Sequence, residues 1–308
     1  MVADSRTIWL RTTARIAVLL VLFAPGIALL IVAEDGALAV VYVSAATLLI
    51  GCAAHLLAIL STAALAGLPA AIAAGVALGS LLPGSLPAGL MAGALGGALV
   101  QLMLSPMILS LPALPVAGVA LALSGVAERL LSLLFLVSAA DTSGPDDQAL
   151  GLWLGLAIAA PLVCLVVTYR LDSSFWATAL RSWRISPATA AARGVDAVRI
   201  ALPAIAAVGA MAGFAGGLLA AMPHIVPGPA MGLYIAGAAL IAGGRSLATL
   251  ILVLACLWML PEIVAGYAPE VADMRPVLFA AAGLFLIFMQ PPKALGFGDP
   301  ALRPEARF

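Results

Sequence analysis

The chain has 308 residues, of which 64% are hydrophobic and only 9% are charged, and its formal net charge at pH 7 is zero. This composition is too apolar for a soluble globular domain, so lipid must act as the solvent for most of the chain. The balanced charge leaves no basic face, which argues against a nucleic-acid-binding protein.

We therefore expect an all-α integral membrane protein, because a helix satisfies its own backbone hydrogen bonds in lipid. About ten apolar runs have lengths suited to membrane segments; they cover residues 16–33, 37–60, 64–82, 88–110, 113–138, 149–169, 199–222, 230–243, 246–262 and 276–291. The first run has a cleaved signal peptide as its alternative, but it is long for one and Val32-Ala33-Glu34 is a poor cleavage site. One or two runs are expected to be broken or re-entrant, above all the short eighth run.

The distribution of charge supports an orientation for these spans. If both termini lie in the cytoplasm, only Arg129 and Arg275 of the 14 basic residues fall on the outer side. Such an excess of basic residues on the cytoplasmic side is the usual signature of membrane orientation. We therefore predict one transmembrane domain over residues 1–308, with cytoplasmic termini and a cytoplasmic loop at residues 170–198.

Polar side chains within the apolar runs are few. His55 lies in the second run, and an ionisable group inside a membrane span is a functional candidate. Its alternative role is that of a neutral imidazole hydrogen-bonded across helices. Gln101 and Ser105 in the fourth run are candidates for lining a solute pathway, or else they satisfy helix carbonyl groups. The chain has no Walker A, HExxH or GxSxG motif, so no catalytic residue and no metal site is expected.

The predicted cytoplasmic loop is rich in arginine. Within it, Trp176, Leu180 and Trp183 recur at the spacing of one helix face, while Arg181 and Arg184 face elsewhere. That pattern predicts an amphipathic helix in the membrane interface, with its indole rings at the level of the headgroups.

A second, shorter helix is predicted directly after this amphipathic segment. Ser186 is a favourable N-cap, Pro187 suits the first helical position, and alanines such as Ala190 and Ala191 favour helix. Gly194 provides the left-handed residue that commonly ends a helix. Such a helix is either a docking element for a soluble partner or part of an ordinary solvated loop, and spacing alone does not decide between them.

Small residues predict how the spans pack. The seventh run carries glycines at three- and four-residue spacing, namely Gly209, Gly213, Gly216 and Gly217. Stripes of this kind let helix backbones approach closely in lipid. The fourth run carries a similar stripe at Gly89, Gly93, Gly96 and Gly97, and generic packing of small residues is the alternative explanation for both stripes.

Residues 178–222 resemble the ATPase-coupling loop and following helix of permeases from ABC transporters of the branched-chain amino acid type. The residues that carry the resemblance are Ala179-Leu180-Arg181, Trp183-Arg184, Ala190 to Ala192, Gly194-Val195 and the run from Ala212-Gly213 to Gly217. Ile185-Ser186-Pro187 stands where the family usually has acidic residues. A looser resemblance covers residues 37–296, in which Leu57-Ala58-Ile59-Leu60 replaces the family's Ser-Leu-Gly-His segment.

This resemblance implies the permease subunit of an ATP-driven importer in the bacterial cytoplasmic (inner) membrane, with no enzymatic activity and no bound cofactor of its own. ATP and Mg would bind two cytoplasmic ATPase subunits, and a groove on these subunits would receive the coupling helix. The coupling residues that the resemblance implies are Arg184, Ser186, Pro187, Ala190, Ala191, Arg193 and Gly194. Further implied partners are a second, similar permease subunit and a periplasmic binding protein that delivers branched-chain or related amino acids.

Two other functions stay open from the sequence. One is a stand-alone secondary transporter or channel for a small solute, although the chain shows no internal repeat of the kind many secondary transporters have. The other is an accessory subunit of a membrane complex without transport of its own. Neighbouring genes for an ATPase and a binding protein would favour the importer over both.

Overall fold

A computed structural model of the chain describes residues 37–61, 63–81, 86–110, 113–138, 147–185, 187–192, 194, 196–220, 229–242 and 247–259. The first and last predicted spans, 16–33 and 276–291, and both termini lie outside the described residues. The described part is helical, without a strand, and its elements follow one another along the chain as α2 (Ala37–Leu60), η1 (Ala63–Gly67), α3 (Leu68–Ser80), α4 (Leu86–Ser110), α5 (Ala113–Ser138), α6 (Asp147–Asp172), α7 (Phe175–Ile185), α8 (Pro187–Ala192), α9 (Ala197–Leu219), α10 (Pro229–Ala242), α11 (Leu247–Leu254) and η2 (Ala255–Met259).

Five of these helices are long and apolar enough to cross a membrane. They are α2, α4, α5, α6 and α9, with candidate spans at Val41–Leu60, Pro87–Ser110, Pro115–Leu133, Gly155–Asp172 and Val198–Leu219. The predicted runs 37–60 and 113–138 agree with α2 and α5 at both ends, and the other three agree within three residues. The all-α membrane class is thus supported by five helices in the described part.

The remaining predicted runs differ from single spanning helices. The third run, 64–82, is divided into the short 3₁₀ helix η1 and the helix α3. The eighth is α10, whose 14 residues are too few to cross the hydrocarbon core as one helix. The ninth begins as α11 and continues as the π-helix η2. The number of broken or re-entrant segments stays a prediction, because the ninth run continues beyond the described residues.

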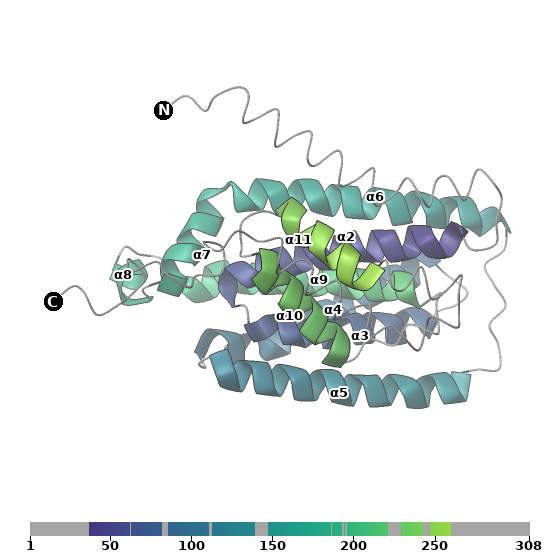
Figure 1. Cartoon of the computed structure of the whole chain (residues 1–308), viewed down its shortest axis with the longest axis horizontal. Helices are drawn as coiled ribbons and strands as arrows, with labels where there is room; N and C mark the ends of the chain where they lie inside the picture. Colours follow the sequence, from purple (N-terminus) through teal and green to yellow (C-terminus); the bar gives the residue numbers. More distant parts are fainter. Residues whose placement is uncertain are drawn as a thin grey trace, which may run out of the picture.

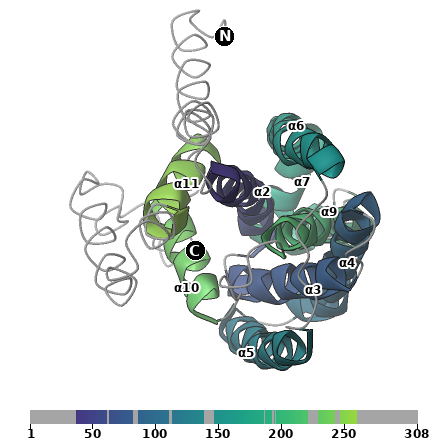
Figure 2. The ribbon, with the colours of Figure 1, turned by 90° about the vertical axis from the view of Figure 1, so that its right-hand side faces the viewer.

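Helix α9 occupies the middle of the bundle and packs against α4, α3 and α2 (Figure 2). Glycine makes the first two of these contacts possible. A β-carbon at Gly213 would overlap the carbonyl oxygen of Gly93 in α4, and it would lie 2.9 Å from the Cα atom of Gly97. On α3, Gly75 meets the backbone of Gly213 in the same way. Three helices thus touch backbone to backbone at one level of the bundle.

The other predicted glycines of α9 lie at the same two contacts. A β-carbon at Gly216 would come within 2.9 Å of the backbone nitrogen of Val76 in α3. One at Gly217 would lie 3.0 Å from a methyl carbon of Leu90 in α4. The order of these contacts along the chain shows that α9 runs parallel to α3 and antiparallel to α4.

The exposed surface of the bundle is apolar, the reverse of a soluble protein. Helix α2 is buried on all sides, with Leu48, Leu49 and Ile50 in succession inaccessible. Helices α4, α5 and α6 instead present bare apolar faces; examples are Leu95, Met103, Val126, Leu130, Val163 and Val166, each more than half exposed. Large exposed apolar faces of this kind fit lipid or another membrane chain, not water.

Candidate functional site

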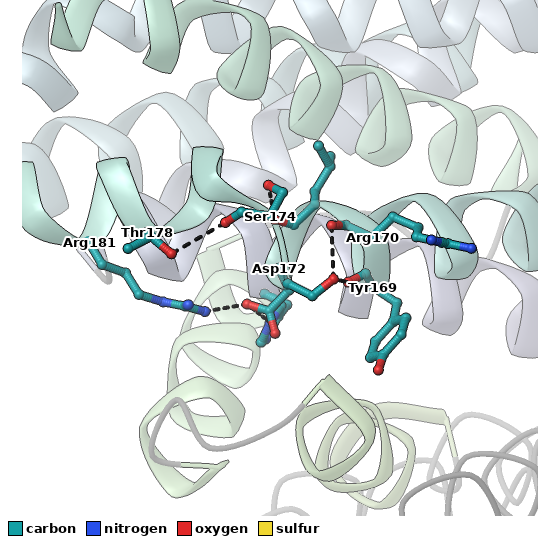
Figure 3. Close-up of polar contacts among 9 residues, drawn as sticks. Tyr169, Arg170, Asp172, Ser174, Thr178 and Arg181 are labelled. Carbon is teal, nitrogen blue, oxygen red and sulfur yellow. Dashed lines mark hydrogen bonds and ion pairs between the residues drawn. The ribbon is translucent and has the colours of Figure 1, made fainter. Parts of the chain in front are cut away.

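The ion pairs of the described residues all lie at the end of the bundle where α7 and α8 are found (Figure 1). Helix α6 ends there at Asp172, and a turn at Ser173 and Ser174 leads directly into α7. The hydroxyl of Ser174 donates to the carbonyl oxygen of Leu171 at 2.6 Å, and that of Thr178 donates to the carbonyl of Ser174 at 3.3 Å (Figure 3). These bonds satisfy carbonyl groups left free at the corner, so the turn is tight and well defined.

The apolar face of α7 packs on protein. Leu180 is completely buried, and Trp176 is half-buried while its indole N–H donates to the carbonyl oxygen of Ile200 in α9 at 3.1 Å. That the indole rings of α7 lie at headgroup level stays a prediction, because contact with protein does not fix the depth of α7 in a membrane. The helical spacing of Trp176, Leu180 and Trp183 correctly predicts one apolar face on α7. Spacing alone does not tell whether lipid or protein covers that face.

A carboxylate ties three helices together next to this turn. One oxygen of Asp172, at the end of α6, pairs with the guanidinium of Arg181 in α7 (Figure 3). The same oxygen lies 3.4 Å from Nε2 of His55 in α2. His55 is buried, and its Nε2 makes no hydrogen bond to this oxygen. Through Asp172, His55 thus contacts the end of the bundle where α7 and α8 lie. The sequence did not predict this partner.

Helix α8 has the boundaries expected from its sequence. It begins at Pro187 and ends at Ala192, and Gly194 follows with a φ of 76°. The amide of Gly194 donates to the carbonyl oxygen of Ala191 at 2.9 Å, which is one of the two bonds of a Schellman cap. Ser186 and Arg193 lie outside the described residues, as do the side chains of Arg184 and Pro187.

Helix α8 is exposed on one side. It packs against α7, burying Ala190, whereas Ala191, Ala192 and Gly194 are exposed. Among the described helices, α8 lies farthest out at the end of the bundle (Figure 1). Small side chains such as Ala191 and Ala192 let another protein approach the helix backbone closely.

The following helix, α9, starts with a cap that sequence reasoning also missed. The carboxylate of Asp196 accepts from the backbone amides of Val198 at 3.1 Å and Arg199 at 3.3 Å. It also pairs with the guanidinium of Arg199 at 3.1 Å. The signal was available, since an aspartate directly before an apolar run is a typical N-cap. Residues 193–196 separate α8 from the central helix α9 in the chain, and of these the structure describes Gly194 and Asp196.

The two other candidate pathway residues lie in α4. The hydroxyl of Ser105 donates to the carbonyl oxygen of Leu102 at 2.6 Å, within its own helix. Gln101 is completely buried, and neither its amide oxygen nor its amide nitrogen has a hydrogen-bond partner. An unpaired buried polar group of this kind costs about 1–3 kcal/mol. Its neighbour in α9 is Gly209, where a β-carbon would lie 2.8 Å from the Cβ atom of Gln101.

Within the described part of the chain, no group of three His, Cys, Asp or Glu residues could hold a metal ion. Comparison of the chain with family models, with curated proteins and with solved structures found no match. Similarity to known proteins therefore assigns neither a family nor a function to the chain.

Proposed function

We propose that the chain is the permease subunit of an ATP-driven ABC importer of the branched-chain amino acid type. The observation that carries the proposal is α8, a short capped helix exposed at one end of an apolar bundle and joined almost directly to the central helix. The segment that forms it is also the one in which the sequence resemblance is most specific.

A coupling role requires a mechanical path from α8 into the spans, and two connections supply one. The first is the short chain connection between α8 and α9, in which Gly194 and the N-cap Asp196 are described. The second is the hydrogen bond from Trp176 of α7 to Ile200 of α9. Because α9 packs against α2, α3 and α4, a displacement of α8 that moves α9 would also move these three helices.

In this proposal the energy comes from outside the chain. Two ATPase subunits, with ATP and Mg, would hold α8 in a groove and push it as they close. A second, similar permease would complete the pathway, and a periplasmic binding protein would deliver branched-chain or related amino acids to the outer side. The bacterial inner membrane, about ten spans and cytoplasmic termini belong to the same proposal.

The proposal is tested by purifying the protein from its native operon in mild detergent, identifying its partners by mass spectrometry and recording ATP hydrolysis. Two stoichiometric ATPases and a second permease are expected. Ala191→Glu places a charge on the exposed face of α8 and should reduce ATPase recovery by about tenfold, since an unpaired charge is costly in an interface.

Ser173→Glu is the matched control, because Ser173 is also exposed at the same end of the bundle but lies outside α8. It should leave ATPase recovery unchanged. A lone polypeptide without nucleotide hydrolysis would contradict the importer and favour a stand-alone secondary transporter or channel.

A further inference from the structure

Gln101 lies near the middle of the membrane span formed by α4. That span runs from Pro87 to Ser110, so at a rise of 1.5 Å per residue Gln101 stands about 21 Å from one end and about 14 Å from the other. These distances are too long for the side chain to reach the water on either side. In the described structure the amide is completely buried and has no hydrogen-bond partner.

The helix contact beside Gln101 is made by backbone. Gly209 of α9 lies against Gly97, Ala98 and Gln101, and a β-carbon on Gly209 would be 2.8 Å from the Cα atom of Ala98. One turn farther along, Gly213 lies against Gly93 and Gly97. The nearest atoms to added β-carbons on Gly209 and Gly213 are backbone atoms and one Cβ atom, so no long side chain separates the two helices at these points.

The unsatisfied amide of Gln101 contributes unfavourably to the free energy of the closed contact between α4 and α9. Its two N–H donors and its carbonyl oxygen are all unsatisfied while α4 and α9 touch. If the helices part at this level, water or a polar solute can satisfy them. A buried polar group left without partners in a native structure calls for such an explanation.

We propose that the α4–α9 contact opens to water in a second conformation, and that Gln101 then contacts a small polar solute with both donor and acceptor groups. The uncharged amide offers donors and an acceptor together, which suits such a solute. This inference rests on the transport role proposed above but not on its energy source. Gln101 is thus a residue of the solute pathway.

The test uses Gln101→Cys in a chain whose native cysteines, Cys52, Cys164 and Cys256, are replaced by alanine. A small, charged, thiol-reactive methanethiosulfonate is applied to membrane vesicles of both orientations, with and without ATP. Water reaching the contact should make this cysteine react at least about tenfold faster than Val208→Cys, which probes a fully buried apolar position in α9.

Ser173→Cys, at an exposed position, confirms that the reagent is active. No reaction at position 101 in any condition, while position 173 reacts, would overturn the inference. Reaction at position 101 in a preparation that yields no ATPase partner would support a solute pathway at Gln101 and contradict the ATP-driven importer. The experiment therefore distinguishes a failure of the further inference from a failure of the proposed function.

A second measurement examines the unsatisfied amide directly. Gln101→Met replaces it by an unbranched apolar side chain of similar length, and we expect the thermal midpoint in detergent to rise by about 2 °C or more. Ser105→Ala, which removes a hydroxyl already bonded within α4, should not raise it. A fall in the midpoint for Gln101→Met would show that the amide is satisfied and would overturn the argument.

Discussion

Gly194 is required for its backbone alone. Its φ is 76°, and an added β-carbon would meet no atom within 4 Å. A side chain there would clash only with its own backbone, and a left-handed conformation costs an ordinary residue about 1–2 kcal/mol. The end of α8 therefore depends on this glycine, whereas the bundle does not.

Gly194→Val should unwind the end of α8 without lowering the thermal midpoint of the bundle. We expect faster hydrogen exchange at residues 190–194, because the amide of residue 194 would lose its bond to the carbonyl of Ala191. Gly194→Asn is the control, since asparagine adopts the left-handed conformation more readily and should keep most of the protection. Equal exchange in both variants would show that the cap is dispensable.

Gly213 is required for the opposite reason, because it has no space for a side chain. A β-carbon there would overlap the backbone of Gly93 and crowd the Cα atom of Gly97. Gly213→Ala must push α4 and α9 apart, and overpacking of this kind costs about 1–3 kcal/mol. We expect a lower thermal midpoint in detergent and weaker protection of α4.

Gly155→Ala provides the comparison for Gly213→Ala. Gly155 lies within α6, where an added β-carbon meets nothing within 4 Å. Alanine there should be neutral or stabilise the helix by about 0.5–1 kcal/mol. If both alanine variants behaved alike, the close approach of α4 and α9 would not limit stability.

Besides the hydrogen bond from Trp176 to Ile200, helix α7 is held to the bundle by an ion-pair contact and an apolar one. The ion-pair contact is the Asp172 carboxylate, which meets Arg181 and His55; the apolar one is the buried side chain of Leu180. The side chain of Arg181 is 47% exposed and that of Asp172 is 31% exposed, so solvent screens their pairing. The apolar contact must therefore supply most of the binding energy of α7.

Asp172→Asn should for that reason change the global free energy of unfolding by less than about 1 kcal/mol. It should nevertheless increase hydrogen exchange along α7, because Arg181 and His55 lose their shared partner. A double-mutant cycle with Arg181→Gln isolates the pair from other effects of each change. Additive effects in the cycle would show that the ion pair contributes nothing to holding α7.

The sequence predicted where helices begin and end better than it predicted what they contact. The ends of α2 and α5 were predicted correctly, because proline, glycine and polar residues punctuate the apolar runs there. The burial of Leu180 and the pairing of Asp172 with His55 were not predicted. Both depend on how helices distant in the chain are rotated toward one another, which local periodicity does not encode.

Part of the candidate site was nevertheless visible in the sequence. The cap at Gly194 and the glycines of α9 follow from local rules, since each requires only a left-handed backbone or an absent side chain. That Gly75 of α3 joins Gly93 and Gly213 required the structure. The importance of Gln101 likewise depends on the lack of any partner around its amide, which no sequence pattern reports.

The whole bundle has two chemically different ends. Helices α2 and α6 finish where α7 and α8 lie, and α9 begins there, as the contacts of His55 and Trp176 show (Figure 1). Since α3 is parallel to α9, its last residues lie at the opposite end. The basic residues of the loop mark the first end as the one expected in the cytoplasm.

This orientation gives a prediction for the molecule as a whole. Ser173→Cys should react with an impermeant thiol reagent only in inside-out membrane vesicles, because the exposed turn between α6 and α7 lies at the basic end. Leu81→Cys is its matched counterpart, since Leu81 is 59% exposed just after α3 and should react only in right-side-out vesicles. The reverse pattern would place α8 on the outer face, where no ATPase could reach it. A coupling role for α8 therefore depends on Ser173 and Leu81 reacting from opposite sides in this sense.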